Sequence, residues 1–520
     1  MAVFREVPFG KPPVGPLRFA RPEPVPAWEG VLDCSSEQAE DMFEGFCAQA
    51  AADGHVLGRE DCLKLHVFRP DGTPAPGGRD ESKRPVYVYI HGGMFWGEDG
   101  VQLTIHDPKK FAEEMGFLVV VMQYRLGVMG FFSSESLADE DQDHSTGNYG
   151  LQDQRLALEW VQKNAAAFGG DPSSVTIHGV SAGAISVCAQ VYSPAAAGLF
   201  HRAIVQSGNC DNQYVFAPRI TAESKSERFA ERVGCGKDLQ PQEMAACLRS
   251  VPLAKLIEHQ LYPVGLHPDQ DLVPMAPILP WVPVVDGSPS GLPLRPADGF
   301  AKGDFNRVPI LMGTTHDEGS LFAPLVPAMT AHSFSPLREV TEQLSRMFSV
   351  KGADLILKQF PWAGRKKDPM RYGQLTEIIT SYIFTCAGQR TTHVLHAAGH
   401  ADVWQWHFLY NDHSLTHKLF GDYHTNESKF IFGPKFGQYR GEDKAMQELI
   451  QGYWLNFVLE GNPNGGGDDS DLFHWERSSP EGVLIIQKEP KMQDVVFPEH
   501  CKFWDNFPFK PLPLDPGNER

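Results

Sequence analysis

The chain has 520 residues, of which 42% are hydrophobic and 11% aromatic, a composition that can bury a large core. Its formal net charge of −19 excludes binding to nucleic acid or to an anionic membrane surface through bulk charge. No apolar run reaches the length of a transmembrane helix, and the first residues contain no apolar segment typical of a signal peptide.

Predicted strands and helices alternate along the chain. The β-rich run at 85–90 and the wholly apolar run at 117–122 predict strands covered on both faces, and apolar spacing predicts a helix over 151–164. Because such alternation is typical of parallel sheets, we expect an α/β fold with a central, mostly parallel sheet and helices on both faces. Further strands are predicted at 175–177, 203–206, 308–312 and 401–410, and long helical stretches at about 222–283 and 334–398.

A Gly-x-Ser-x-Gly motif lies at 179–183, between a predicted strand and a predicted helix. A serine at such a turn is held out of the sheet, and Gly179 and Gly183 leave room for the turn and for a substrate. The first N–H groups of the following helix point toward the hydroxyl. Serine alone is a poor nucleophile, so Ser181 predicts a histidine base and an acid elsewhere in the chain.

Three further turns follow in the sequence. The glycine-rich turn at 91–95 can aim backbone N–H groups at a developing oxyanion, although an ordinary tight turn has the same pattern. The turn at 313–319 comes directly after a predicted strand, and the loop at 421–424 ends in a histidine. The resulting order of serine, acid and histidine is the order expected for an α/β-hydrolase.

Several longer motifs occur in a fixed order, at 7–19, 59–63, 123–127, 147–154, 168–172 and 501–504. Together they make the chain resemble the type-B carboxylesterases, the family that includes cholinesterases and neuroligins. The resemblance covers nearly the whole chain. It implies a single α/β-hydrolase domain over residues 1–520 with helical cap insertions. It also implies a serine esterase that acts on small-molecule esters without a metal or an organic cofactor.

The resemblance assigns the triad residue by residue. It implies that Ser181 is the nucleophile, that His424 acts as general base and then acid, and that Glu318 orients the imidazole. Asp317 is rejected as the acid, because the glutamate of Asp-Glu-Gly stands at the family's triad position.

The resemblance also implies an oxyanion hole made by the backbone N–H groups of Gly93, Met94 and Ala182. Met94 replaces the third glycine of the family's turn. Its backbone is strained if this position needs a positive φ, and its side chain would narrow the pocket.

The expected pocket differs from that of the cholinesterases. Val180 stands where they carry a glutamate, and no tryptophan lies between Cys47 and Cys62 to face a quaternary ammonium group, which argues against choline esters. Leu279 replaces a bulky phenylalanine, which predicts room for longer or branched acyl chains. For Trp96, Trp281, Leu321 and Phe322, core packing is the alternative interpretation. The expected pocket residues are Gly92, Trp96, Val180, Leu279, Trp281, Leu321 and Phe322.

Nine cysteines are present, so at least one is unpaired. The resemblance implies three disulfides and leaves Cys34, Cys188 and Cys210, of which Cys188 is expected to be an unpaired, buried apolar side chain. Three disulfides favour secretion or the secretory pathway, and the alternative is a cytoplasmic protein with reduced thiols. The expected pairs are Cys47–Cys62, Cys235–Cys247 and Cys386–Cys501.

Other functions stay open at this point. A lipase would need an apolar lid, to which residues 259–266 could contribute, and a neuroligin-like binding protein would use the same fold without catalysis. The apolar stripe of 442–459 fits either a homodimer bundle or docking within a monomer. Residues 139–143 resemble the start of a calcium loop but lack its glycine and its final glutamate, so we interpret them as a solvated acidic loop and expect no metal.

Overall fold

The computed structural model describes residues 1–508 except for 35–44, 52–54, 73–74, 79, 81–82, 98–106, 212–214, 237–238, 261–278, 325–335, 362–372, 435–436, 466–471 and 479–481. Most of the segment that could contribute to a lipase lid, residues 261–266, therefore lies outside the described residues.

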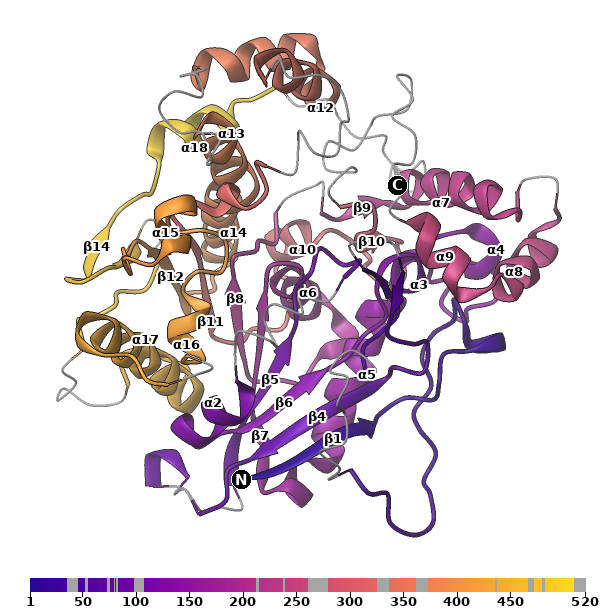
Figure 1. Ribbon diagram of the computed structural model, residues 1–520, viewed down its shortest axis with the longest axis horizontal. Helices are drawn as coiled ribbons and strands as arrows, with labels where there is room; N and C mark the ends of the chain where they lie inside the picture. Colours follow the sequence, from indigo (N-terminus) through magenta and orange to yellow (C-terminus); the bar gives the residue numbers. More distant parts are fainter. Residues whose placement is uncertain are drawn as a thin grey trace.

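A ten-stranded sheet runs through the molecule (Figure 1). Its strand order is β1-β4-β6-β5-β7-β8-β11-β12-β13-β14. The seven strands from β6 to β13 are parallel, whereas β1, β4 and β14 join antiparallel at the two edges. The strands are β1 Ala2–Pro8, β4 Lys64–Arg69, β5 Arg84–Ile90, β6 Leu118–Met122, β7 Gly170–Val180, β8 Arg202–Gln206, β11 Ile310–Thr315, β12 Val403–Phe408, β13 Val483–Ile486 and β14 Lys491–Gln493.

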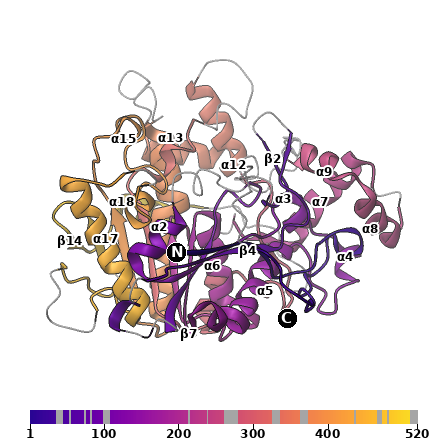
Figure 2. The same ribbon diagram turned by 60° about the horizontal axis from the view of Figure 1, so that its bottom comes forward.

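Alternate side chains of the central strands enter two separate hydrophobic cores, one on each face of the sheet. Helices α5 (Tyr149–Asn164) and α6 (Ala182–Tyr192) pack on one face, and α2 (Pro108–Met115) and α17 (Gly441–Glu460) pack on the other (Figure 2). This arrangement confirms the predicted α/β class with helices on both faces. The long apolar runs were informative because these strands are buried on both sides.

Two helical groups lie outside these layers. Figure 1 shows α7 (Arg219–Val233), α8 (Pro241–Ser250) and α9 (Leu253–Gln260) on the right. It shows α12 (Pro336–Gln359) and α13 (Gly373–Ile379) at the upper left. A π-helical turn, η7 (Thr380–Thr385), continues α13 into α14 (Cys386–Ala397). These groups fall in the two stretches that the sequence predicts to be helical.

The apolar face of α17 is buried inside the chain. Ile450, Tyr453, Trp454 and Phe457 are each fully buried in the core beneath the sheet. For these four side chains, the structure therefore shows docking within the chain.

The structure contains four disulfides. Three join the expected pairs Cys47–Cys62, Cys235–Cys247 and Cys386–Cys501, and the fourth joins Cys188 to Cys210. The expectation that Cys188 is unpaired is therefore wrong. Its partner follows β8, and the crossover from β7 through α6 to β8 brings the two α-carbons to 5.2 Å.

Alkylation of the denatured, unreduced protein should modify only one cysteine. All nine cysteines lie in the described residues, and Cys34 is the one without a disulfide. Mass spectrometry of the alkylated peptides checks this expectation, with a fully reduced sample as the positive control. Modification of all nine cysteines without reductant would contradict the four bonds.

Candidate active site

The Gly-x-Ser-x-Gly motif forms a sharp turn between β7 and α6. Ser181 lies at this turn with φ 59° and ψ −122°, a strained conformation for a residue with a side chain. A Cβ at Gly179 would lie 2.1 Å from the carbonyl oxygen of Gly183, and a Cβ at Gly183 would lie 2.1 Å from that of Ile90. The two glycines are therefore required by the close approach of strand and helix, and the turn holds Ser181 out of the sheet.

A chain of buried hydrogen bonds between neighbouring strands stabilises this turn. The Tyr87 hydroxyl lies 2.6 Å from Nδ1 of His178, whose Nε2 lies 2.9 Å from Oε1 of Gln206. Burial lowers the pKa of His178 to about 3, so its ring is neutral and can accept from Tyr87 and donate to Gln206. The backbone carbonyl of Gln206 in turn accepts the N–H of Ser181 at 2.9 Å. These hydrogen bonds thus link β5, β7 and β8 beneath the serine.

The glycine-rich turn after β5 packs directly on the serine turn. A Cβ at Gly92 would lie 2.7 Å from the carbonyl oxygen of Val180 and 3.1 Å from Cβ of Ser181. Gly93 and Met94 both have positive φ, at 106° and 56°. Position 94 therefore does need a positive φ, as the prediction of strain required. Met94 holds a backbone conformation that glycine adopts more easily.

The expected base and acid lie against each other. Nδ1 of His424 is 2.5 Å from Oε2 of Glu318, and the N–H of Thr315 donates to Oε1 of Glu318 at 2.8 Å. Glu318 is fully buried at the start of η6 (Glu318–Ser320), directly after β11. Nε2 of His424 has no hydrogen-bond partner among the described residues, so the structure records no bond from it to Ser181. Such bonds often tighten only when substrate is bound.

Asp317 joins the loop that carries Glu318 to the loop that carries His424. Its N–H donates to the carbonyl of Asp422 at 2.9 Å, and its carboxylate accepts the N–H of Asp422 at 3.0 Å. Burial raises the pKa of the Asp422 carboxyl to about 7. These two hydrogen bonds fix the Glu318 turn relative to the His424 loop.

A small cavity lies at Ser181, with about 30 Å³ open to the centre of a water molecule. Two of its lining rings also contact His424, with ring centroids 4.9 Å away for Phe322 and 5.0 Å for Phe384. Ser181 therefore lines the cavity, and His424 packs against two of the rings that line it. The lining residues are Met94, Ser181, Ala182, Ile185, Asn209, Val215, Leu279, Phe322, Ile383 and Phe384.

The structure corrects part of the expected pocket. Leu279 and Phe322 line the cavity, but Trp281 is fully buried and packs against Phe132 and Phe229, and Val180 lies in the core on the other face of the sheet. Trp96 and Leu321 are half-buried and are not among the lining residues, whereas Gly92 contacts the serine turn itself. Large apolar side chains suit a core as well as a pocket, so their sequence positions could not separate the two. The lining residues missed from the sequence are Ile185, Asn209, Val215, Ile383 and Phe384.

Glu427 is a second buried carboxyl beside the acid. It is 1% exposed, and neither of its carboxyl oxygens has a hydrogen-bond partner among the described residues. Burial, and then the charge of Glu318, raise its pKa from 4.5 to about 8. Glu427 is therefore protonated in the folded protein at neutral pH.

Glu427→Gln should flatten the pH dependence of stability. A folded-state pKa above the unfolded value means that the folded protein holds the extra proton between pH 4.5 and about 8. Stability from this group is fully present below pH 4.5 and is lost as the pH rises toward 8, by at most about 1.4 kcal/mol per pH unit. Denaturant unfolding across this pH range should show that the free energy of unfolding of the variant rises relative to that of the parent as the pH rises. A constant difference between the two would contradict the buried, protonated carboxyl.

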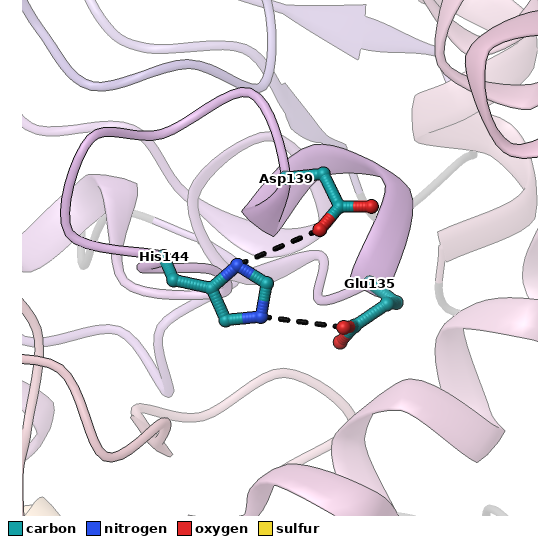
Figure 3. Close-up of side chains that lie close together, drawn as sticks. All are labelled: Glu135, Asp139 and His144. Atoms are coloured by element: carbon teal, nitrogen blue, oxygen red, sulfur yellow. Dashed lines mark ion pairs between the residues drawn. The ribbon is translucent and has the colours of Figure 1, made fainter.

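The acidic region after α4 (Glu135–Ala138) contains one group with metal-ligand side chains. Glu135, Asp139 and His144 place ligand atoms within 4.8 Å of one another (Figure 3). All three are exposed, and the carboxylate of Glu135 also pairs with the guanidinium of Arg219. Because a cation already neutralises this carboxylate, we assign no metal role to the cluster.

These features define an α/β-hydrolase: a mostly parallel sheet, a strained serine after a central strand, and an acid and a histidine in loops beyond later strands. A model of the carboxylesterase family matches residues 1–504. The chain belongs to the carboxylesterase family and is a carboxylic ester hydrolase. None of the helices that the structure describes combines the length and apolar character needed to span a membrane.

The relatives are enzymes of the same kind. Carboxylesterase 1D of Rattus norvegicus is 33% identical over 555 residues, which cover 100% of this chain and 91% of the relative. The medium-chain fatty acyl-CoA hydrolase precursor of Anas platyrhynchos is 30% identical, with 96% and 87% covered. Among solved structures, a PNB esterase has a TM-score of 0.75 at 28% identity, with 96% and 95% covered. Aspergillus niger EstA has a TM-score of 0.77 at 26% identity, with 97% and 94% covered.

Proposed function

We propose that the protein hydrolyses small to medium carboxylic esters through an acyl-enzyme, with Ser181, His424 and Glu318 as its triad. The observation that carries this proposal is the 2.5 Å contact between His424 and Glu318. His424 also packs against Phe384, which lines a cavity together with Ser181. The buried carboxylate fixes the imidazole so that Nδ1 carries its proton and Nε2 is free to act as a base.

The proposed reaction has two steps. Nε2 of His424 takes the hydroxyl proton as Oγ of Ser181 attacks the ester carbonyl, and the resulting oxyanion accepts from the N–H groups of Gly93, Met94 and Ala182. His424 then protonates the departing alcohol. A water molecule, deprotonated by the same imidazole, releases the acid and restores Ser181. The chain's own groups supply each of these roles.

The cavity supports broad acceptance of apolar esters. Its lining is apolar apart from Ser181 and Asn209, and Leu279 contributes a side chain smaller than phenylalanine. A site with few fixed polar groups selects its ligand mainly by size. We therefore propose medium-length acyl chains, and we propose an oxidising compartment of the secretory pathway on the basis of the four disulfides.

Turnover of p-nitrophenyl esters from acetate to palmitate tests the function. We expect hydrolysis with an optimum at a medium chain length, together with covalent labelling of Ser181 by a fluorophosphonate. A rate that rises sharply above the solubility limit of the substrate would indicate a lipase. A folded protein that neither hydrolyses these esters nor takes the label would be a binding protein of the neuroligin kind, and the strained Met94 turn would be the first place to look for the reason.

A further inference from the structure

We propose that the Cys188–Cys210 disulfide and Asn209 form a clamp that fixes one wall of the Ser181 cavity and so sets the enzyme's preference for acyl chain length. The inference rests on the proposed ester hydrolysis. It concerns a wall that the sequence did not reveal, because both the disulfide and the lining role of Asn209 emerge only from the fold.

The disulfide joins the helix that carries the serine turn to the loop that follows β8. Helix α6 begins directly after Ser181, and Ile185 in its first turn lines the cavity. Cys188 is fully buried in the same helix, and Cys210 is 4% exposed. The bond therefore ties the loop to the element that positions the nucleophile.

The loop is already pressed against the serine turn before it reaches Cys210. A Cβ at Gly208 would lie 2.5 Å from Cβ of Ala184 and 3.1 Å from the carbonyl oxygen of Ser181. The N–H of Ser207 donates to the carbonyl of Gly313 at 2.8 Å. At Gly208 the backbone of the loop lies directly against the start of α6, so a movement of one would displace the other.

Asn209 connects this fixed loop to the cavity wall that contains Ile383. Its Nδ2 donates to the carbonyl of Ile383 at 2.5 Å, and its Oδ1 accepts the N–H of Asp211 at 3.2 Å. Ile383 lies in the π-helical turn η7, where the regular ladder of main-chain hydrogen bonds is interrupted. An external donor is therefore well placed to fix this carbonyl.

The wall held in this way consists of Ile383 and Phe384. Both line the cavity, and the ring of Phe384 packs on the imidazole of His424. The path from Cys188 through Asn209 thus reaches two side chains that line the Ser181 cavity, one of which packs on His424. Without the clamp, this wall can move away from α6, and the cavity then admits a longer chain but holds a short one less well.

The test compares two double variants on p-nitrophenyl acetate and octanoate. C188A/C210A should raise the octanoate-to-acetate ratio of kcat/KM by about tenfold, the discrimination that one or two methylenes carry in an apolar pocket. The change should arise from a lower KM for octanoate and a lower kcat for acetate. C235A/C247A is the matched control, because it removes the disulfide between α7 and α8, and its ratio should change by less than about twofold.

A second variant protects the test against poor folding. N209A keeps the disulfide but removes the donor to Ile383, and it should shift the ratio in the same direction. Thermal unfolding of each variant separates lost stability from changed selectivity. An active parent whose ratio is unaltered in both C188A/C210A and N209A would overturn the clamp alone. A parent that hydrolyses no ester would overturn the proposed function and the clamp with it.

Discussion

Ser181→Ala should lower kcat for a p-nitrophenyl ester by about 10⁶-fold, the loss that follows removal of the nucleophile from a working triad. The variant should fold normally, because alanine keeps the backbone of the turn. Its residual rate would come from the oxyanion donors and substrate binding alone. The measurement is a stopped assay of ester hydrolysis at an enzyme concentration high enough for a weak residual rate to be detected above spontaneous hydrolysis.

Glu318→Gln provides an internal check on this result. The amide keeps the shape of the side chain but favours the wrong tautomer of His424, so kcat should fall by about 10⁴-fold. Because triad members act as a unit, adding Glu318→Gln to Ser181→Ala should produce no further loss. Ser186→Ala, which removes another buried hydroxyl from α6, is the matched control and should keep most of the turnover. More than about one per cent of the parent kcat in Ser181→Ala would point to a different nucleophile.

Arg125→Met should lower the free energy of unfolding by about 3–5 kcal/mol. Arg125 donates from Nε and Nη2 to the Asp153 carboxylate at 2.8 and 2.7 Å, and its backbone N–H donates to the same carboxylate at 2.9 Å. Asp153 is fully buried, and burial raises its pKa. Removal of the guanidinium would leave this carboxyl without its main partner in the core.

The same substitution should reduce activity, because the segment around Arg125 holds the turn that we propose as part of the oxyanion hole. The Tyr124 hydroxyl donates to the carbonyl of His91 at 2.9 Å, and the N–H of Gly127 donates to the carbonyl of Phe95 at 2.6 Å. Loosening the segment would therefore displace the donors at Gly93 and Met94.

Urea unfolding of three variants tests whether the loss of stability comes from leaving a buried charge unpaired. Arg125→Met with Asp153→Leu should recover much of the loss, since replacing both partners by apolar groups leaves no unpaired charge. Lys444→Met removes a partner from the exposed pair with Glu448 and should change stability by less than about 0.5 kcal/mol. A loss below about 1 kcal/mol in Arg125→Met would contradict the importance of the buried pair.

The parts of the fold that could be predicted are those with a strong local pattern. The central strands are continuous apolar runs because both of their faces are buried, and the serine turn has a motif that its geometry requires. The edge strands β1 and β14 are only partly buried and show no such pattern, so the sequence did not locate them.

The cavity wall was harder to predict for a different reason. The π-helical turn at Thr380–Thr385 has the composition of an ordinary helix, and its register shift turns Ile383 and Phe384 toward the cavity only in the folded chain. Cys188 and Cys210 meet because a strand-helix-strand crossover folds back on itself, a contact that spacing alone does not specify. Trp281 was expected in the pocket because its position lines the pocket in members of the family that the chain resembles. In the structure its side chain is fully buried and packs against Phe132 and Phe229.

The packing around Gly179 and Gly183 bears on how other chains of this shape are interpreted. Both glycines are required because strand and helix approach too closely for a Cβ, and neither supplies a reacting group. A chain that lost its serine would still need glycine at both positions to make the crossing. The spacing of the two glycines therefore indicates the fold and not the activity. Catalysis must be judged from the residue between the glycines and from the acid and histidine in the later loops.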